Sequence, residues 1–493
     1  MSLSGAGSAS GTAARPAGSR RPSCRYKRHR LATVAALCGM FAIGVLVYGM
    51  LTSSGPEVYQ ARVTVNTSGK VTGEISTRYI GLSFESGTLN SGKFDDVGDL
   101  AQLLRNLGHS VMRFGGNSVD TSFQGITPSA LVGLARLVQA SGWTVLYSEN
   151  LGEFHAARVT ADARAVSVAL GSGLFGFACG NEPDVFGGNG IRPRSYTGSD
   201  YLSEAATCFA AIRAGAPNAA LEGPDAAGAP YWLAEYAVKE GGTVSWFGQH
   251  YYPLGCGLHG KSPAQLAGTL LSPALTAKEI ATFTRAAADA KTAGAQLRMT
   301  ETNSACGGGA RGLSDSYAAA LWVVDYLLTG AEHGVHGMNF HGGLDTSCQG
   351  YTPLCQVGTN EYAAQPIYYG MLFTHLLGAG HLLPVTVSTS SPAGNVTAFA
   401  LKPLTGGGLR LMVENLSQYQ ADVALRVGGN PGTATVLQMT GPSLLATSGV
   451  EIQGARVGAN GSFTPGKPNT VQCTSGSCPV TIAPYTAVLV TVG

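Results

Sequence analysis

Short apolar runs alternate with amphipathic helical patterns eight times between residues 76 and 375, and this alternation restricts the fold more than any other feature of the chain. The first run is YIGLSFE (79–85) and the last is GVHGMNFHGG (334–343). Strands that alternate with helices form parallel sheets, and eight such units in about 300 residues match a (β/α)8 barrel. Periodicity alone also allows an open, doubly wound sheet. We predict an α/β fold with a (β/α)8 TIM barrel at 76–375, because polar groups follow almost every strand.

The polar groups at the strand ends predict where the site lies. In a (β/α)8 barrel, the carboxyl ends of all eight strands meet at one mouth, and active-site groups lie there. Polar residues that only stabilise the fold would not coincide in this way. The strand ends carry Glu85, Asn117, Asp120, Asn150, Asn181, Glu182, Asp225, His250, Tyr251, Tyr252, Glu301, Asn303, Asn339 and His341.

The helical pattern disappears after residue 376. Runs such as NVTAFALKP and TAVLVTVG are short and are separated by Gly, Pro, Asn and Ser. Short strands at this spacing are typical of an antiparallel β-sandwich, which we predict at 376–493. Residues 53–75 have the same character, and we expect a linker there with a strand that joins the sandwich.

The N-terminal region predicts a membrane segment. A basic run, RRPSCRYKRHR, ends at residue 30 and is followed by an uncharged apolar run, which places a disordered cytoplasmic tail at 1–30 and a transmembrane anchor at 31–52. A cleaved signal segment is the alternative, although the site for cleavage is poor. In both cases the body faces the outside of the cell, either anchored in the cell envelope or secreted.

Cysteine content agrees with that location. Eight of the ten cysteines follow the apolar segment, and two pairs are close together in CQGYTPLC and CTSGSC, as in disulfides that close loops. A zinc site needs a tighter Cys/His cluster, so no metal is predicted. The 31 basic and 29 acidic residues nearly cancel, and no basic patch with interleaved aromatic residues occurs in the body, so we expect no nucleic-acid partner.

Two carboxylates stand out, because each ends a strand and precedes a polar turn: Glu182 after the fourth strand and Glu301 after the seventh. Across a barrel mouth these two can face each other. Glycoside hydrolysis requires such a pair, one acid that protonates the leaving oxygen and one carboxylate that attacks the anomeric carbon. Glu182 follows an apolar strand, so desolvation could raise its pKa. Glu301 is flanked by Arg298, Thr300, Thr302 and Ser304, which favour its charged form if they point inward.

The motifs GNEPD (180–184), QHYY (249–252) and TETNSACGGGA (300–310) resemble glycoside hydrolase family 79, the β-glucuronidase and heparanase family; GLSFE and RFGGNSVD agree with it. The resemblance extends from about residue 57 to the C-terminus. It implies a retaining double displacement with Glu182 as acid/base and Glu301 as nucleophile. It also implies that sugar hydroxyls bind Glu85, Asp120 and Asn181.

The same resemblance implies that His250 and Tyr252 line the site. It also implies that backbone N–H groups of the glycine run 307–309, in particular those of Gly307 and Gly308, bind the substrate carboxylate. The family usually has a tyrosine five residues after the nucleophile, where this chain has Cys306. A disulfide from Cys306 to Cys256 is a hypothesis. Structural roles also stay open: Glu85 could cap the turn that follows it, Asp120 could form an Asx turn, and His250 and Tyr252 could be core residues.

We therefore expect a retaining glycosidase that acts on β-glucuronides or related uronic-acid glycans and needs no cofactor. The alternatives are a retaining barrel glycosidase on neutral sugars, if Cys306 abolishes the carboxylate site, and a surface carbohydrate-binding protein that has lost turnover.

Overall fold

The computed structural model describes residues 58–429 and 431–493. The predicted cytoplasmic tail at 1–30, the predicted membrane segment at 31–52 and the first residues of the predicted linker lie outside the described residues. Within the described residues, no helix combines the length and the apolar character needed to cross a bilayer.

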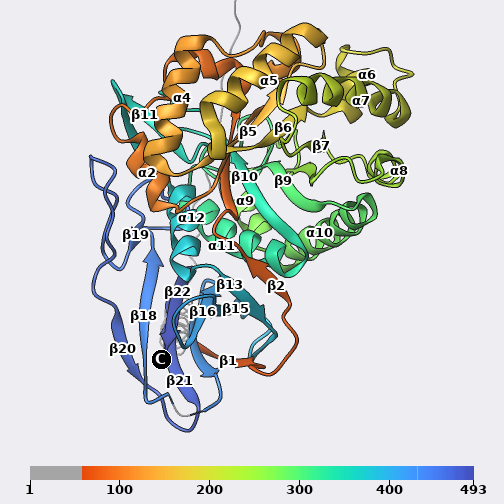
Figure 1. Cartoon of the computed structure of the whole chain (residues 1–493). Coiled ribbons are helices and arrows are strands. Elements are labelled where there is room, and N and C mark those ends of the chain that lie inside the picture. Colours follow the sequence, from red (N-terminus) through yellow and green to blue (C-terminus); the bar gives the residue numbers. More distant parts are fainter. Residues whose placement is uncertain (1–57, 430) are drawn as a thin grey trace, which may run out of the picture. The chain divides into compact units, whose positions relative to one another are not determined.

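Eight parallel strands form one sheet in the order β6-β5-β4-β3-β10-β9-β8-β7 (Figure 1). The two end strands of this order come together at an isolated parallel bridge between Phe177 of β6 and Leu221, the residue before β7. The sheet is therefore a nearly closed barrel, and the predicted TIM barrel is confirmed. Its strands are β3 (Ile80–Glu85), β4 (Val111–Gly115), β5 (Thr144–Glu149), β6 (Leu174–Cys179), β7 (Glu222–Ala226), β8 (Trp246–Tyr251), β9 (Gln296–Thr302) and β10 (Val335–His341).

The barrel strands are largely buried because helices cover their outer side while side chains fill the interior. β4 and β5 are buried at every residue. The helices that surround the sheet or lie in its loops are α2 (Leu100–Asn106), α3 (Ser118–Thr121), α4 (Pro128–Ser141), α5 (Ala156–Leu170), α6 (Phe186–Asn189), α7 (Gly198–Gly215), α8 (Pro230–Glu240), α9 (Pro263–Leu270), α10 (Pro273–Ala293), α11 (Tyr317–Glu332) and α12 (Pro366–Leu377). Three short 3-10 helices are η1 (Ser86–Ser91), η2 (Gly171–Gly173) and η3 (Pro183–Val185), and a hairpin is formed by β11 (Leu354–Gly358) and β12 (Glu361–Ala364).

Helix α11 packs between the barrel and the C-terminal strands. Every residue from Tyr317 to Ala331 is buried, as expected for a helix that is covered on all sides. Its first residue, Tyr317, donates from its hydroxyl to the carbonyl oxygens of Met439 and Tyr485 at 2.8 and 2.9 Å. The barrel and the strands after it therefore share a buried interface.

Two further sheets pack face to face around a second apolar core, which contains Val63, Leu411, Val423 and Val490. This is the arrangement of a β-sandwich. One sheet has the order β14-β1-β17-β21, and the other β19-β18-β22-β16-β15-β13-β2, with β20 paired to β18. The strands are β1 (Val58–Val65), β2 (Gly73–Ile75), β13 (Gly380–Leu383), β14 (Val385–Thr389), β15 (Val396–Pro403), β16 (Leu409–Asn415), β17 (Gln420–Arg426), β18 (Thr433–Thr440), β19 (Glu451–Ile452), β20 (Asn469–Gln472), β21 (Ser477–Ile482) and β22 (Thr486–Val492).

The sandwich differs from the predicted antiparallel one in a single pairing. β1 precedes the barrel in the chain, yet it pairs antiparallel with β14 and parallel with β17. A strand that arrives from before the barrel is not restricted by a hairpin, so it can run in either direction beside β17. The sandwich is therefore built from both ends of the described chain.

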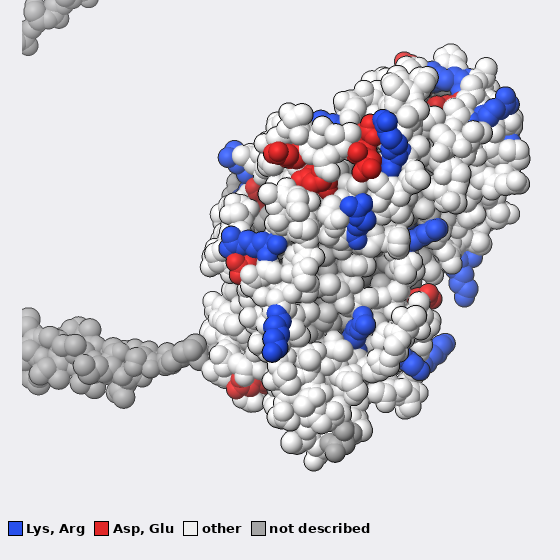
Figure 2. Space-filling model, turned by 60° about the vertical axis from the view of Figure 1, so that its left-hand side comes forward, with Lys and Arg blue, Asp and Glu red and all other residues white. Residues whose placement is uncertain are grey.

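Four disulfides join the eight described cysteines: Cys179 to Cys208, Cys256 to Cys306, Cys348 to Cys355, and Cys473 to Cys478. The two closely spaced pairs close loops, as the sequence predicts. On the surface, basic and acidic side chains are interspersed over the face in Figure 2, with uncharged surface between them. The absence of a nucleic-acid partner stays a prediction.

Candidate active site

Arg113 lies at the centre of the barrel mouth. It is the one charged residue of β4, it is fully buried, and it donates to Asp225 at 2.5 Å, to Glu301 at 2.6 Å and to Asn181 at 2.7 Å. Gly115 makes room for the guanidinium, because a side chain at this glycine would collide with it. A single buried cation thus connects side chains from three other parts of the barrel.

Glu301, near the end of β9, accepts two hydrogen bonds that fix the orientation of its carboxylate. Arg113 donates to Oε2, and the hydroxyl of Tyr252 donates to Oε1 at 2.7 Å. Burial alone raises the pKa of Glu301, but the positive charges of His341, His250 and Arg113 and the Tyr252 hydroxyl lower it well below its usual value. Glu301 is therefore ionised at neutral pH.

Glu182 lies just beyond β6, and its side chain is 22% exposed. Its Oε1 is 2.9 Å from Nδ1 of His250, whose Nε2 is 2.9 Å from Oδ1 of Asp225. Burial lowers the pKa of His250, but Asp225 and Glu301 raise it to about 10, so the ring is charged. Burial also raises the pKa of Asp225, whereas Arg113 and His250 lower it to about 2. The mouth thus contains ionised carboxylates between two buried cations.

Glu182 and Glu301 face each other. One carboxylate oxygen from each residue and a ring nitrogen of His250 lie within 4.8 Å of one another. Such a group could offer ligands to a metal ion, but Arg113 and His250 already place positive charge beside both carboxylates, which opposes a further cation. That no metal or cofactor is needed stays a prediction.

Two hydrogen bonds to the side-chain amide oxygen of Asn181 fix its orientation. Oδ1 accepts from Arg113 and, at 3.0 Å, from the N–H of Gly116. Nδ2 has no acceptor among the described residues, and its predicted bond to a sugar hydroxyl beside Glu182 stays a prediction.

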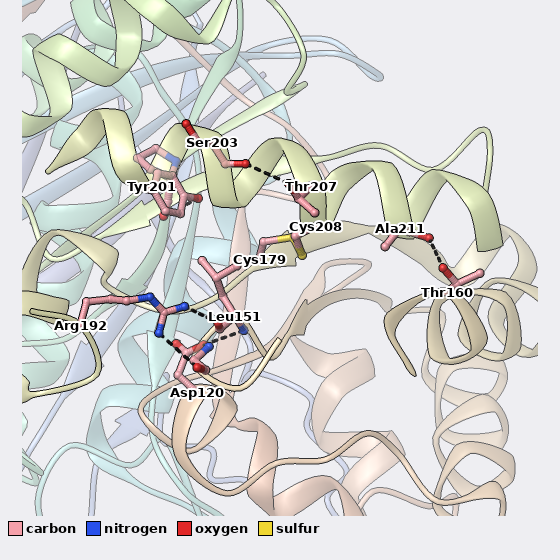
Figure 3. Close-up of a disulfide and its surroundings, with 12 residues drawn as sticks. Asp120, Leu151, Thr160, Cys179, Arg192, Tyr201, Ser203, Thr207, Cys208 and Ala211 are labelled. Carbon is pink, nitrogen blue, oxygen red and sulfur yellow. Dashed lines mark hydrogen bonds between the residues drawn. A yellow bond between two sulfur atoms is a disulfide. The ribbon is translucent and has the colours of Figure 1, made fainter. Parts of the chain in front are cut away.

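Asp120 acts on the backbone in this structure. Its Oδ1 accepts from the N–H groups of Leu151 and Gly152, each at 2.9 Å, and its Oδ2 accepts from the N–H of Asn181 at 2.7 Å. The side chain is buried, and Figure 3 shows it beside Leu151, with Arg192 donating to the carbonyl oxygen of Leu151. Asp120 therefore fixes the loop that carries Asn181. It does not form the Asx turn considered within NSVDTS. A direct contact of Asp120 with sugar stays a prediction.

The same loop is fixed by a disulfide. Cys179, the last residue of β6, is bonded to Cys208 in the middle of α7 (Figure 3). Because Cys179 precedes Asn181 by two residues and Glu182 by three, the bond limits the movement of the strand end that carries both.

Glu85 ends β3 and lies at the edge of the site. It accepts from the N–H of Asn117 at 3.2 Å and from the N–H of Ser118 at 2.8 Å, both at the start of α3. The cap of the following turn that the sequence suggests is not formed, because the Glu85 side chain makes no cap hydrogen bond to η1. Its Oε1 is also 3.8 Å from Nε2 of His341, and its side chain is 34% exposed. Gly116 allows this approach, because a side chain there would collide with the carboxylate.

The glycine run lies beside Tyr252. Its N–H groups at Gly307 and Gly308 have no acceptor within the described part of the chain, and both glycines have positive φ and open space around them. The carbonyl of Gly308 accepts from the N–H of Tyr351 at 3.2 Å, and the ring of Tyr351 stacks on Tyr252 with 6.1 Å between centroids. The expected bond between Cys306 and Cys256 is present and joins this loop to the loop after β8.

The source of the charge on Glu301 differs from the one predicted from its neighbours in sequence. Arg298 lies deeper in the barrel, where it donates to Asn339 at 2.6 Å. Thr302 bonds to the carbonyl of Tyr251, and Ser304 to Ser314. Alternate residues of a strand point to opposite faces of the sheet. Residues nearer the start of β9, such as Arg298, also lie further from the mouth of the barrel. Neighbours of Glu301 in sequence therefore do not surround its carboxylate.

Sequence reasoning assigned no role to four residues of the site: Arg113, Asp225, His341 and Tyr351. A signal for Arg113 existed, because a charged residue in an apolar strand must find a buried partner. Asp225 and His341 stand at strand ends and were identifiable only as polar positions. Tyr351 lies in the loop after β10, which carries no recognisable pattern.

Replacement of Arg113 by methionine should destabilise the fold strongly. It leaves the buried carboxylates of Asp225 and Glu301 without their cation, and breaking a buried ion pair costs about 3 to 5 kcal/mol. Arg136→Met is the matched control, because its ion pair with Asp95 is at the surface, where the arginine is 60% exposed, and its loss should cost less than about 1 kcal/mol. Thermal and urea unfolding compare the two variants; equal small losses would contradict the central role of Arg113.

The fold and the site together define a class: barrel proteins with two opposed carboxylates at the mouth and a β-sandwich beside the barrel. No family model matches the sequence. The chain is similar to a β-glucuronidase of Aspergillus niger, at 26% identity over 356 residues, which is 65% of this chain and 63% of that protein. It is also similar to a β-glucuronidase of Neurospora crassa, at 27% identity over 263 residues, 48% of this chain and 45% of that protein. The predicted resemblance to β-glucuronidases is confirmed, whereas family 79 itself stays a prediction.

The alignment covers less than two thirds of the length of either curated relative. Among solved structures, a 4-O-α-L-rhamnosyl-β-D-glucuronidase from Fusarium oxysporum superimposes with a TM-score of 0.70 at 20% identity, over 88% of this chain and 100% of that one. A family 51 arabinofuranosidase from Xanthomonas axonopodis pv. citri gives 0.67 at 14% identity, over 88% and 100%. At these identities the likeness shows the fold.

Proposed function

We propose that the protein is a retaining glycoside hydrolase that cleaves β-glucuronides or related uronic-acid glycans. The observation that carries this proposal is the approach of Glu182 and Glu301 to within 4.8 Å across the barrel mouth. Carboxyl groups about 5 to 5.5 Å apart are typical of retaining enzymes, whereas inverting enzymes need about 6.5 to 9.5 Å to admit a water molecule. The curated β-glucuronidases support the choice of substrate.

Glu301 is the nucleophile. Its low pKa makes it an anion over the whole neutral range, and Arg113 and Tyr252 fix the direction of its two oxygens. Attack on the anomeric carbon forms a glycosyl ester, and the two hydrogen bonds keep the carboxylate ready for release of the sugar in the second step.

Glu182 is the acid/base. One of its oxygens contacts His250 and the side chain is partly exposed, so the other oxygen can reach the leaving group and later a water molecule. Around it, Asn181 and Glu85 bind sugar hydroxyls, and Asp120 fixes the loop of Asn181. His250 and Tyr252 line the site beside the two carboxylates.

The substrate carboxylate binds the N–H groups of Gly307 and Gly308. These donors lie in open space at the rim, beside Tyr252 and Tyr351. The position that is a tyrosine in the resembling family is Cys306 here and is bonded to Cys256. This observation favours the second candidate function, hydrolysis of neutral sugars, because a disulfide donates no hydrogen bond to a carboxylate.

A panel of 4-nitrophenyl β-glycosides separates these candidates. The glucuronide should give a kcat/KM at least about tenfold above the glucoside, galactoside and xyloside, which corresponds to about 1.4 kcal/mol of selective binding. If only the neutral glycosides are hydrolysed, the protein is a neutral-sugar glycosidase and the proposed uronic-acid substrate is wrong. Binding of glucuronides without turnover would identify a carbohydrate-binding protein.

The body is located outside the cytoplasm, and the N-terminal segment anchors it to the cell envelope. The four disulfides support the first statement, because such bonds persist in oxidising compartments. Residues 20–51, a basic run followed by an uncharged apolar one, support the second. Fractionation of cells with alkaline extraction of membranes tests both; release of the protein by alkali would contradict anchoring.

A further inference from the structure

Asp225 is buried beneath the mouth, with 1% of its side chain exposed, and substrate does not reach it. Nevertheless it touches three groups of the site. Its Oδ2 is bonded to Arg113, its Oδ1 is 2.9 Å from Nε2 of His250, and its carbonyl oxygen accepts from the N–H of Glu182 at 2.8 Å. The acid/base residue and Asp225 are therefore connected twice, through the backbone and through the His250 ring.

The backbone at both residues is strained. Glu182 has φ of 54° and Asp225 has φ of 56°, in the left-handed region that residues with a side chain rarely adopt. Asp184 joins the same segments, because its carboxylate accepts from the N–H groups of Ala227, Gly228 and Ala229 at 2.8 to 3.0 Å. Strain of this kind persists where the surroundings enforce it, and it occurs often at functional sites. The connection of Glu182 to Asp225 is thus built into the loops.

We propose that Asp225 is a positioning residue for the acid/base: it keeps His250 protonated on both ring nitrogens, so that Nδ1–H donates to Oε1 of Glu182 and the acidic proton of Glu182 resides on Oε2. This inference rests on the proposed glycosidase function. The ring of His250 is rigid, so a donor bond at Nε2 to Asp225 and one at Nδ1 to Glu182 also fix the ring plane.

The arrangement gives each proton a definite place. In the first step Oε2–H of Glu182 is transferred to the glycosidic oxygen, the bond from that oxygen to the anomeric carbon breaks, and Glu301 bonds to this carbon. Glu182 is then a carboxylate that accepts from His250. In the second step Glu182 takes a proton from water, the water oxygen bonds to the anomeric carbon, and Glu301 leaves as an anion. His250 keeps both of its protons throughout.

Four ionisable groups face His250, each from a different part of the barrel. Asp225 comes from β7, Glu182 from the loop after β6, and Glu301 from β9; Arg113, from β4, places Nη2 at 3.4 Å from Nε2. With Glu182 protonated as the acid, two anions, Asp225 and Glu301, stand against the one cation Arg113 and raise the pKa of His250 to about 10, so the ring is charged. Without Asp225 the remaining charges are nearly balanced and burial favours the neutral ring.

The variant Asp225→Asn tests this role. The substitution replaces the carboxylate by a neutral amide, and a neutral His250 whose Nε2–H donates to the amide oxygen would present a lone pair at Nδ1. That lone pair draws the proton of Glu182 to Oε1, away from the substrate. We expect kcat/KM for an alkyl β-glucuronide to fall at least about 100-fold more than for the 2,4-dinitrophenyl β-glucuronide, which needs no acid. A role in folding alone would reduce both equally, and equal reduction overturns the proposal.

The control is Glu222→Gln. Glu222 starts the same strand, β7, and is fully buried; neither of its carboxylate oxygens has a hydrogen-bond partner among the described residues, and burial and the charge of Asp225 raise its pKa, so glutamine is a close isosteric replacement. This variant should leave the ratio of the two substrates unchanged. If the control shifts the ratio as much as Asp225→Asn does, the effect belongs to the strand and the proposal fails.

A measurement on the unaltered protein covers the case in which Asp225→Asn does not fold. In protein labelled with 15N in histidine, with His250→Gln used for assignment, both ring nitrogens of His250 should show protonated shifts from pH 5 to 8. A single protonated nitrogen at pH 6 overturns the proposal. If the unaltered protein hydrolyses neither substrate, the proposed function fails instead, while the ring measurement still decides the arrangement of Asp225 and His250.

Discussion

Glu301→Ala should lower kcat on 4-nitrophenyl β-glucuronide by at least about 1,000-fold, with the fold intact. The variant removes the ionised carboxylate that faces Glu182, so neither attack nor the covalent intermediate is possible. Because the substitution also removes a buried anion that compensates Arg113, Glu301→Gln should be measured beside it as the isosteric variant. Both should retain binding of glucuronides.

The configuration of the product formed with added azide tests this prediction further. In Glu301→Ala, azide can occupy the space of the lost carboxylate and attack the same face, and the product should be the α-glycosyl azide. Glu279→Gln is the control variant, because Glu279 is a buried carboxylate that accepts from Trp322 on an outer helix. Full activity of a folded Glu301→Ala, or a β-glycosyl azide as its product, would contradict the role of Glu301 as nucleophile.

Glu182→Ala should affect substrates according to their leaving groups. General acid catalysis contributes about 10²- to 10⁴-fold, so kcat/KM for an alkyl glucuronide should fall by this factor, whereas the value for the 2,4-dinitrophenyl glucuronide should change little. Loss of the base also slows the second step, and the glycosyl enzyme should accumulate as a burst of dinitrophenol in stopped-flow measurements.

In this variant azide attacks the glycosyl enzyme from the face that water uses, and the product should be the β-glycosyl azide. The opposite stereochemistry of the two azide products separates the roles of Glu182 and Glu301 within one assay. A uniform loss on all substrates without a burst would instead indicate that Glu182 only stabilises the mouth.

Much of the barrel was predictable because its signal is local. Strands such as β6 are continuous apolar runs, and most strand ends carry a polar residue, so the eight units and the positions of Glu182 and Glu301 can be read without knowledge of contacts. The direction of β1 beside β17 was not predictable, because paired residues such as Gln60 and Asp422 are 362 positions apart and no turn connects the strands.

The charge network of the site was less accessible from sequence. Arg113, Asp225 and His250 belong to three strands, and only the closed sheet brings them within hydrogen-bond distance. Asp120 is a second example. The contact with sugar that the family resemblance implies stays a prediction, whereas no local pattern indicated that three backbone N–H groups donate to its carboxylate. Which direction a side chain takes at a strand end depends on loops that no periodicity describes.

The division of the sandwich between both ends of the described chain has a consequence for the order of synthesis. Among the described strands β1 leaves the ribosome first, yet its partner β17 follows 362 residues later, after the whole barrel. At about 5 to 20 residues per second, β1 stays without its sheet for at least about 20 seconds. The barrel is thus an insertion within the sandwich, and a gene shortened at residue 376 would encode β1 without the strands that cover its apolar face.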